Sequence, residues 1–93
     1  MNQNIIEYYR QLRVSEDLMA AFSLSKTPED VADTAVEQGD KLGFSFTKEE
    51  ALAAGMNFKA LCSQAVNDDE LTEFELEMIS AGLITATPRT PKH

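Results

Sequence analysis

The chain has 93 residues, a formal net charge of −8 and 43% hydrophobic residues, which is typical of one small globular domain with a modest core. The excess of acidic residues argues against nucleic acid or an anionic membrane as the partner and favours a basic protein surface. The longest apolar runs are far shorter than a bilayer span, so membrane insertion is not expected, and the N-terminus lacks the pattern of a secretion signal.

An amphipathic helical segment is expected over residues 3–24, where apolar residues recur at helical spacing. Ser15 can cap a helix, so it predicts either a kink or a restart within this segment. Of the two adjacent tyrosines, Tyr9 belongs to the apolar stripe. Tyr8 points in a different direction and is expected on the exposed side.

Two further helices are predicted from their start signals. Residues 27–30 (Thr-Pro-Glu-Asp) place a cap residue before a proline at the first helical position, and Gly43 is expected to end that helix. Thr47 and Glu50 form a capping box for the next helix. That helix is expected to break or kink at Gly55, because glycine costs about 1 kcal/mol relative to alanine inside a helix. The apolar face continues after the break through Phe58, Leu61, Cys62 and Ala65.

The residues that carry most enzymatic chemistry are scarce. Cys62 is the single cysteine, so it cannot form an intrachain disulfide, and a buried structural role is expected for it. His93 is the single histidine, and one histidine with one cysteine does not supply a zinc site. The acidic residues 68–70 are adjacent and lack the alternating spacing of a calcium loop. With no glycine-rich phosphate loop and no catalytic triad motif, neither an enzyme nor a metal or other cofactor is predicted.

An acidic turn at residues 67–70 leads into a short helix over residues 73–80, whose start is marked by the capping box of Thr72 and Glu75. Its apolar side chains spread over about 200°, which is wide for a helix packed on one small domain. One interpretation is a further core helix. The other is a loosely held docking helix that becomes fully ordered on a partner, because eight residues are too few for a stable isolated helix. The predicted partner-binding residues are Glu70, Leu71, Phe74, Leu76, Met78 and Ile79.

The predicted fold is all-α, a small bundle of three to four helices with a disordered C-terminal tail. We expect a helical bundle over residues 1–66, an acidic recognition helix over residues 67–82, and a flexible tail over residues 83–93. The prolines of the tail rule out a helix there. All 16 acidic residues precede the tail, which carries only basic charge.

Four features of the chain occur in a characteristic order. They are the N-terminal amphipathic helix, the helix start at residues 27–30, the segment 42–50 (Leu-Gly-Phe-Ser-Phe-Thr-Lys-Glu-Glu), and the segment 70–82 (Glu-Leu-Thr-Glu-Phe-Glu-Leu-Glu-Met-Ile-Ser-Ala-Gly). Together they resemble the nitrogen-fixation-associated, Nif-eleven-like leader-peptide family. These are the long leaders of ribosomally made peptides that enzymes then modify. The resemblance covers most of residues 1–82.

The resemblance implies a precursor peptide rather than an enzyme. Its partners would be a peptide-modifying enzyme and a peptidase-containing transporter that cuts after a double-glycine-type site, matched here by Ala81 and Gly82. The tail would then be the substrate, with Thr85, Thr87 and Thr90 as candidates for modification. The tail has no cysteine, so thioether rings cannot close within it. The protein would be cytoplasmic, and the tail would be exported after cleavage.

Two other interpretations stay open. A stand-alone family member would be a small acidic adaptor that binds a partner protein and is never cut. A small enzyme would require a convergent set of titratable groups, which no motif provides. Weak self-association through the apolar side of the last helix also stays open.

Overall fold

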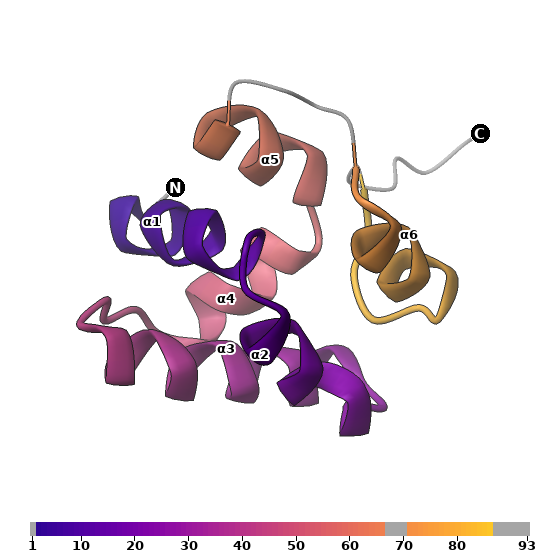
Figure 1. Ribbon diagram of the computed structural model, residues 1–93, viewed down its shortest axis with the longest axis horizontal. Helices are drawn as coiled ribbons and strands as arrows, with labels where there is room; N and C mark the ends of the chain where they lie inside the picture. The colour runs from indigo at the N-terminus through magenta and orange to yellow at the C-terminus, as the bar shows by residue number, and fades with distance from the viewer. Residues whose placement is uncertain (1, 67–70, 87–93) are drawn as a thin grey trace.

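The computed structural model describes residues 2–66 and 71–86, and within these ranges the regular secondary structure is entirely helical (Figure 1). The described helices are α1 (Gln3–Leu12), α2 (Glu16–Ala20), α3 (Pro28–Leu42), α4 (Lys48–Gly55), α5 (Phe58–Val66) and α6 (Glu73–Ser80), with a short 3-10 helix, η1 (Ala21–Leu24), after α2. The all-α prediction is confirmed, whereas the predicted number of three to four helices is too low.

The larger number of helices comes from two local breaks. Ser15 accepts a hydrogen bond from the backbone N–H of Leu18 at 3.3 Å, so the first predicted segment restarts as α2 instead of continuing from α1. The chain breaks again at Gly55, the last residue of α4, and resumes at Phe58 in α5. The break at Gly55 was predicted, and Ser15 restarts the helix instead of only kinking it.

The cap residues act as their local sequence predicts. Thr27 accepts from the backbone N–H of Asp30 at 3.1 Å at the start of α3, and Gly43 ends that helix in the left-handed conformation, with φ of 90°. Thr47 and Glu50 form a reciprocal capping box at the start of α4, with bonds of 2.9 and 3.1 Å.

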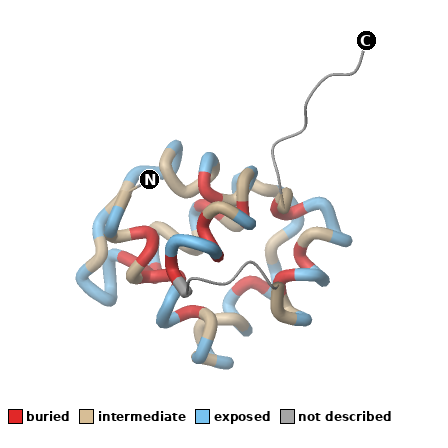
Figure 2. The backbone as a smooth tube through the Cα atoms, turned by 90° about the horizontal axis from the view of Figure 1, so that it is seen from above, coloured by how far each residue is buried: buried red, intermediate tan, exposed pale blue. Residues whose placement is uncertain are grey.

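The core lies where the helices face each other, and the red segments of Figure 2 mark its backbone positions. Its buried apolar residues are Ile5, Ile6, Tyr8, Tyr9, Leu12, Phe22, Ala32, Ala54, Phe58, Leu61, Cys62, Ala65, Met78, Leu83 and Ile84. Both Tyr9 and Cys62 are fully buried, as predicted.

The expected exposure of Tyr8 is wrong. Tyr8 is buried, and its hydroxyl donates to the side-chain carbonyl of Gln38, whose amide in turn donates to the carbonyl of Leu18 at 3.0 Å. A buried tyrosine is tolerated when its hydroxyl finds a partner of this kind. Burial raises the pKa of Tyr8 above its usual value.

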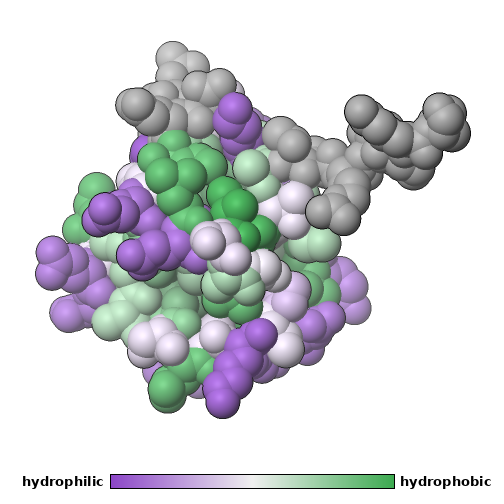
Figure 3. All heavy atoms as spheres, turned by 90° about the vertical axis from the view of Figure 1, so that its right-hand side faces the viewer, coloured by the Kyte–Doolittle hydropathy of each residue, from purple (hydrophilic) through white to green (hydrophobic). Residues whose placement is uncertain are grey.

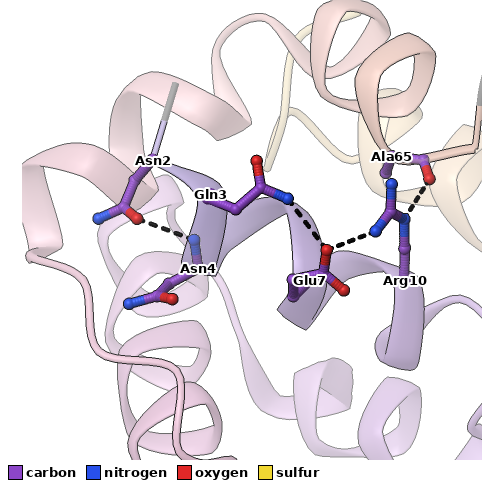
Figure 4. A network of polar contacts seen from close by, with 6 residues as sticks. All are labelled: Asn2, Gln3, Asn4, Glu7, Arg10 and Ala65. Carbon is purple, nitrogen blue, oxygen red and sulfur yellow. Dashed lines mark hydrogen bonds and ion pairs between the residues drawn. The ribbon is translucent and has the colours of Figure 1, made fainter.

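Polar contacts tie α1 to α5. Arg10 donates from Nε to the carbonyl of Ala65 and pairs with Glu7, which also accepts from the amide of Gln3 at 3.0 Å (Figure 4). The carbonyl of Ala65 lies in the last turn of α5, where it has no intrahelical partner. Arg10 therefore holds α1 against this end of α5.

A second set of contacts ties α1 to α4. The side chain of Asn2 caps α1 by accepting from the N–H of Asn4 at 2.8 Å (Figure 4), and its amide donates to both carboxylate oxygens of Glu50, at 3.1 and 3.2 Å. The backbone hydrogen bond from Thr47, followed by the bond from Asn2, lowers the pKa of Glu50. The capping-box glutamate of α4 thus also reaches a neighbouring helix.

Candidate functional site

The α6 helix forms from signals at both of its ends. At its start, Thr72 and Glu75 form a capping box, with the N–H of Thr72 donating to Glu75 Oε1 at 2.8 Å. At its end, Gly82 adopts a φ of 79°. The N–H of Gly82 then donates to the carbonyl of Ile79 at 3.0 Å, and the N–H of Leu83 donates to the carbonyl of Met78 at 2.9 Å. These two bonds are the pattern of a Schellman motif, which needs a residue such as glycine in the left-handed conformation.

The inner side of α6 is fixed to the bundle by Glu75, which is only 1% exposed. While Oε1 closes the capping box, Oε2 accepts a hydrogen bond from the hydroxyl of Tyr9 in α1. The same hydroxyl oxygen lies 3.4 Å from Sγ of Cys62 in α5. Burial, helped by the contacts with Cys62 and Glu75, raises the pKa of Tyr9 well above its usual value. Of the two interpretations of this helix from the sequence, a core helix or a loosely held docking helix, this buried cluster favours the first, because it joins α6 to two other helices.

The predicted partner-binding residues are divided between the two sides of α6. Met78 is buried, and the ring of Phe74 packs against the ring of Phe22 with centroids 6.1 Å apart. Leu71 and Ile79 are half-buried against the core, and Leu76 is 53% exposed. The structure therefore uses most of the predicted apolar set to hold α6 in place. Glu70 lies outside the described residues.

The exposed side of α6 consists of Glu73, Leu76, Glu77 and Ser80, which we call the outer face of α6. These residues have the i, i+3, i+4, i+7 spacing of one helix face, so one exposed leucine stands among acidic side chains. Figure 3 looks onto the side of the molecule where α6 lies and shows apolar surface bordered by hydrophilic side chains. This arrangement can bind a surface that is both apolar and basic.

A surface groove of about 330 Å³ adjoins the outer face. Phe74 and Met78 of α6 line it together with Phe22 from η1, so these two predicted residues still reach the surface at their edges. Glu77 and Ala81 also line the groove, and they connect it to the outer face and to the predicted cleavage position. The groove extends the apolar contact that Leu76 alone can offer.

The predicted cleavage residues, Ala81 and Gly82, are exposed, but the predicted tail does not begin at the next residue. Leu83 is only 8% exposed and Ile84 only 4%. Thr85, a candidate for modification, is half-buried and bonded through both its N–H and its carbonyl. The expected boundary between a packed body and a flexible tail at Gly82 therefore falls within the packed structure. Thr87 and Thr90 lie outside the described residues.

Sequence reasoning did not find the buried hydrogen bond between Glu75 and Tyr9, and nothing in the local sequence distinguishes a buried capping glutamate from an exposed one. It also missed the burial of Leu83 and Ile84. A signal for Leu83 was present, because the residue after the left-handed glycine of a Schellman motif commonly packs on the helix.

No protein-family model, curated protein or solved structure matches this chain. Within residues 2–66 and 71–86, no helix is long and apolar enough to span a bilayer. The same part of the chain holds no group of three or more His, Cys, Asp or Glu side chains placed to bind a metal ion.

Proposed function

We propose that the chain is a precursor peptide whose helical body is recognised by a peptide-modifying enzyme through the outer face of α6 and the adjoining groove. The observation that carries the proposal is the position of Leu76, 53% exposed between Glu73 and Glu77 on a helix whose other side is fixed by Glu75. A fixed helix loses little further conformational freedom on binding, so such a surface favours recognition.

The exposed Ala81 and Gly82 directly after α6 support a role in processing, because small residues suit a narrow protease channel. The resemblance to Nif-eleven-like leaders supports the same assignment. In this proposal the body raises the effective concentration of the C-terminal segment at the active site of the modifying enzyme. A peptidase-containing transporter then cuts after Gly82.

A stand-alone adaptor that is never cut is the second candidate. The burial of Leu83 and Ile84 favours it, because cleavage after Gly82 removes two side chains from the core. The adaptor would use the same outer face of α6 for a basic partner protein and would stay intact.

Intact mass spectrometry of the chain from its own cells tests the two candidates. A fragment ending at Gly82, or a mass change confined to residues 83–93, supports the precursor. An intact, unmodified chain that co-purifies with a folded protein supports the adaptor.

Two matched surface variants test the outer face. Leu76→Arg should reduce processing about tenfold or more, since a charge placed in a binding interface typically costs more than 1.4 kcal/mol. Val14→Arg is the control, because Val14 is 85% exposed and lies in the turn between α1 and α2. Equal processing of both variants and the unaltered chain would contradict recognition through the outer face.

A further inference from the structure

The short segment after the predicted cleavage position binds to the junction between α4 and α5. The N–H of Thr85 donates to the carbonyl of Gly55 at 2.7 Å, and the carbonyl of Thr85 accepts from the N–H of Phe58 at 2.9 Å. The carbonyl of Ala86 accepts from the N–H of Lys59 at 2.8 Å. Gly55 ends one helix and Phe58 begins the next, so these backbone groups have no partner within their own helices. The segment supplies those partners.

The same segment also completes the core. Leu83 and Ile84 are buried, and Ile84 lines an apolar cavity of about 50 Å³ together with Tyr9 and Met78. Ile84 Cγ2 would lie 3.6 Å from a Cβ atom at Gly55, which is an ordinary packing distance. The segment therefore contacts the body through both its backbone and its side chains, as a bound peptide does.

We propose that the α4–α5 junction is a peptide-binding site that the chain's own residues 83–86 occupy, and that cutting the chain after Gly82 empties this site and opens the domain. We call residues 83–86 the strap. The inference deepens the proposed function, because it rests on cleavage at Gly82. It adds that the cleavage position is tied to the core and that the cut lowers the stability of the body.

Covalent attachment keeps the strap in its site. A segment of four residues with three backbone hydrogen bonds to the α4–α5 junction gains little net free energy on binding as a free peptide, because its translational and conformational freedom is lost. Attachment through Gly82 supplies a high local concentration that removes most of this cost. A cut at Gly82 ends that advantage, so the released segment leaves and exposes the apolar surface that Leu83 and Ile84 had covered.

The strap also controls access to the bond that is cut. Proteases bind their substrates in extended form on both sides of the cleaved bond, whereas Gly82 is held in a Schellman turn and the next two side chains are buried. Cleavage therefore requires the strap to open first, and its rate reports the opening equilibrium when opening and closing are fast.

Hydrogen exchange and proteolysis of the purified full-length chain test the proposal without any partner protein. In the unaltered chain, the amides of Phe58 and Lys59 should be protected by about 100-fold or more relative to free amides. Elastase, which cuts after small residues, should cut slowly at Ala81. In Ile84→Ala, both the exchange of these two amides and the cutting rate should rise about tenfold or more, because a buried isoleucine side chain is lost.

Two control variants separate opening of the strap from general destabilisation. Val14→Ala removes an exposed side chain outside the outer face of α6 and should be cut at the rate of the unaltered chain. Ile6→Ala removes a buried side chain of α1 that does not line the cavity next to Ile84. Ile6→Ala should speed amide exchange in α1 but leave the cutting rate at Ala81 unchanged, because Ile6 stays buried when only the strap opens, whereas Ile84→Ala should speed both.

The cut chain gives the decisive result. After elastase treatment, the C-terminal fragment should separate from the body on gel filtration, and the body should unfold at a lower urea concentration than the uncut chain. The proposal is overturned if the fragment stays bound, if the amides of Phe58 and Lys59 exchange as free amides, or if Ile84→Ala is cut no faster. Because no modifying enzyme takes part, these outcomes do not depend on whether the outer face of α6 binds one.

Discussion

Glu75 in α6 accepts a hydrogen bond from the hydroxyl of Tyr9 in α1, across 66 positions of the sequence, and both side chains are almost completely buried. The other carboxyl oxygen of Glu75 caps its own helix through the N–H of Thr72. One side chain therefore both starts α6 and places it against the bundle. This double role explains how a helix of only eight residues keeps a defined position, since a helix of that length has little stability of its own.

A double-mutant cycle measures this link. Tyr9→Phe leaves Glu75 Oε2 buried without its partner, and Glu75→Gln replaces an acceptor with an amide, so each should reduce the free energy of unfolding by about 1–3 kcal/mol. The two changes should be coupled by about 0.5–3 kcal/mol, because they alter the two partners of the same contact. Tyr8→Phe combined with Glu75→Gln is the control and should be additive, since Tyr8 bonds to Gln38 instead. Urea unfolding gives each value, and additivity of the Tyr9 pair would contradict the link.

The two tyrosines also predict how stability depends on alkaline pH. Burial raises the pKa of both Tyr8 and Tyr9 in the folded state, so both stay neutral there after the unfolded chain begins to ionise near about pH 10. The contribution of the two neutral tyrosines to the free energy of unfolding is complete below that pH. It is lost as the pH rises above it, by up to about 1.4 kcal/mol per pH unit for each tyrosine.

Absorbance of the phenolate provides the measurement. The chain has only these two tyrosines, so the phenolate signal near 295 nm should appear together with unfolding followed by circular dichroism. Tyr8→Phe and Tyr9→Phe should each make the fall in stability less steep. Ionisation of both tyrosines in the folded protein, at an ordinary pKa, would show that their hydroxyls are open to solvent.

Much of the local structure could be predicted because helix caps depend on residues within one turn of each other. Thr27, Thr47 and Thr72 each start a helix as their neighbours indicate. Tyr8 shows the limit of this reasoning. Its partner, Gln38, is 30 positions away, and a helical wheel does not show that two faces of one helix are both covered by neighbours.

The candidate site could be predicted in position but not in orientation. The wide apolar arc of α6 has two edges, and only the three-dimensional packing decides that Phe74 and Met78 face the bundle while Leu76 faces outward. The strap could not be predicted from the region around it, because its partners, Gly55 and Phe58, lie about 30 positions earlier in the chain.

Two helical glycines should respond oppositely to alanine. A Cβ atom at Gly39 would lie 2.7 Å from the carbonyl oxygen of Phe44 and 2.6 Å from the ring of Phe46, so Gly39→Ala should destabilise the protein by about 1–3 kcal/mol. A Cβ atom at Gly55 would meet only Ile84, at 3.6 Å, so Gly55→Ala should stabilise it by about 0.5 kcal/mol through reduced freedom of the unfolded chain. Thermal unfolding of the two variants checks the signs, and a loss of stability in Gly55→Ala would contradict the packing of Ile84 there.

The division of α6 into an inner and an outer side predicts that stability and recognition can be altered separately. Phe74→Ala should lower the free energy of unfolding by about 2–4 kcal/mol, because its ring packs against Phe22 and lines the apolar cavity next to Ile84. Leu76→Ala should change stability by less than about 0.5 kcal/mol, because its side chain is 53% exposed. Urea unfolding of the two variants gives the comparison. A large loss of stability in Leu76→Ala would mean that the outer face of α6 contributes to the fold, and the effect of Leu76→Arg on processing would then no longer identify a binding surface.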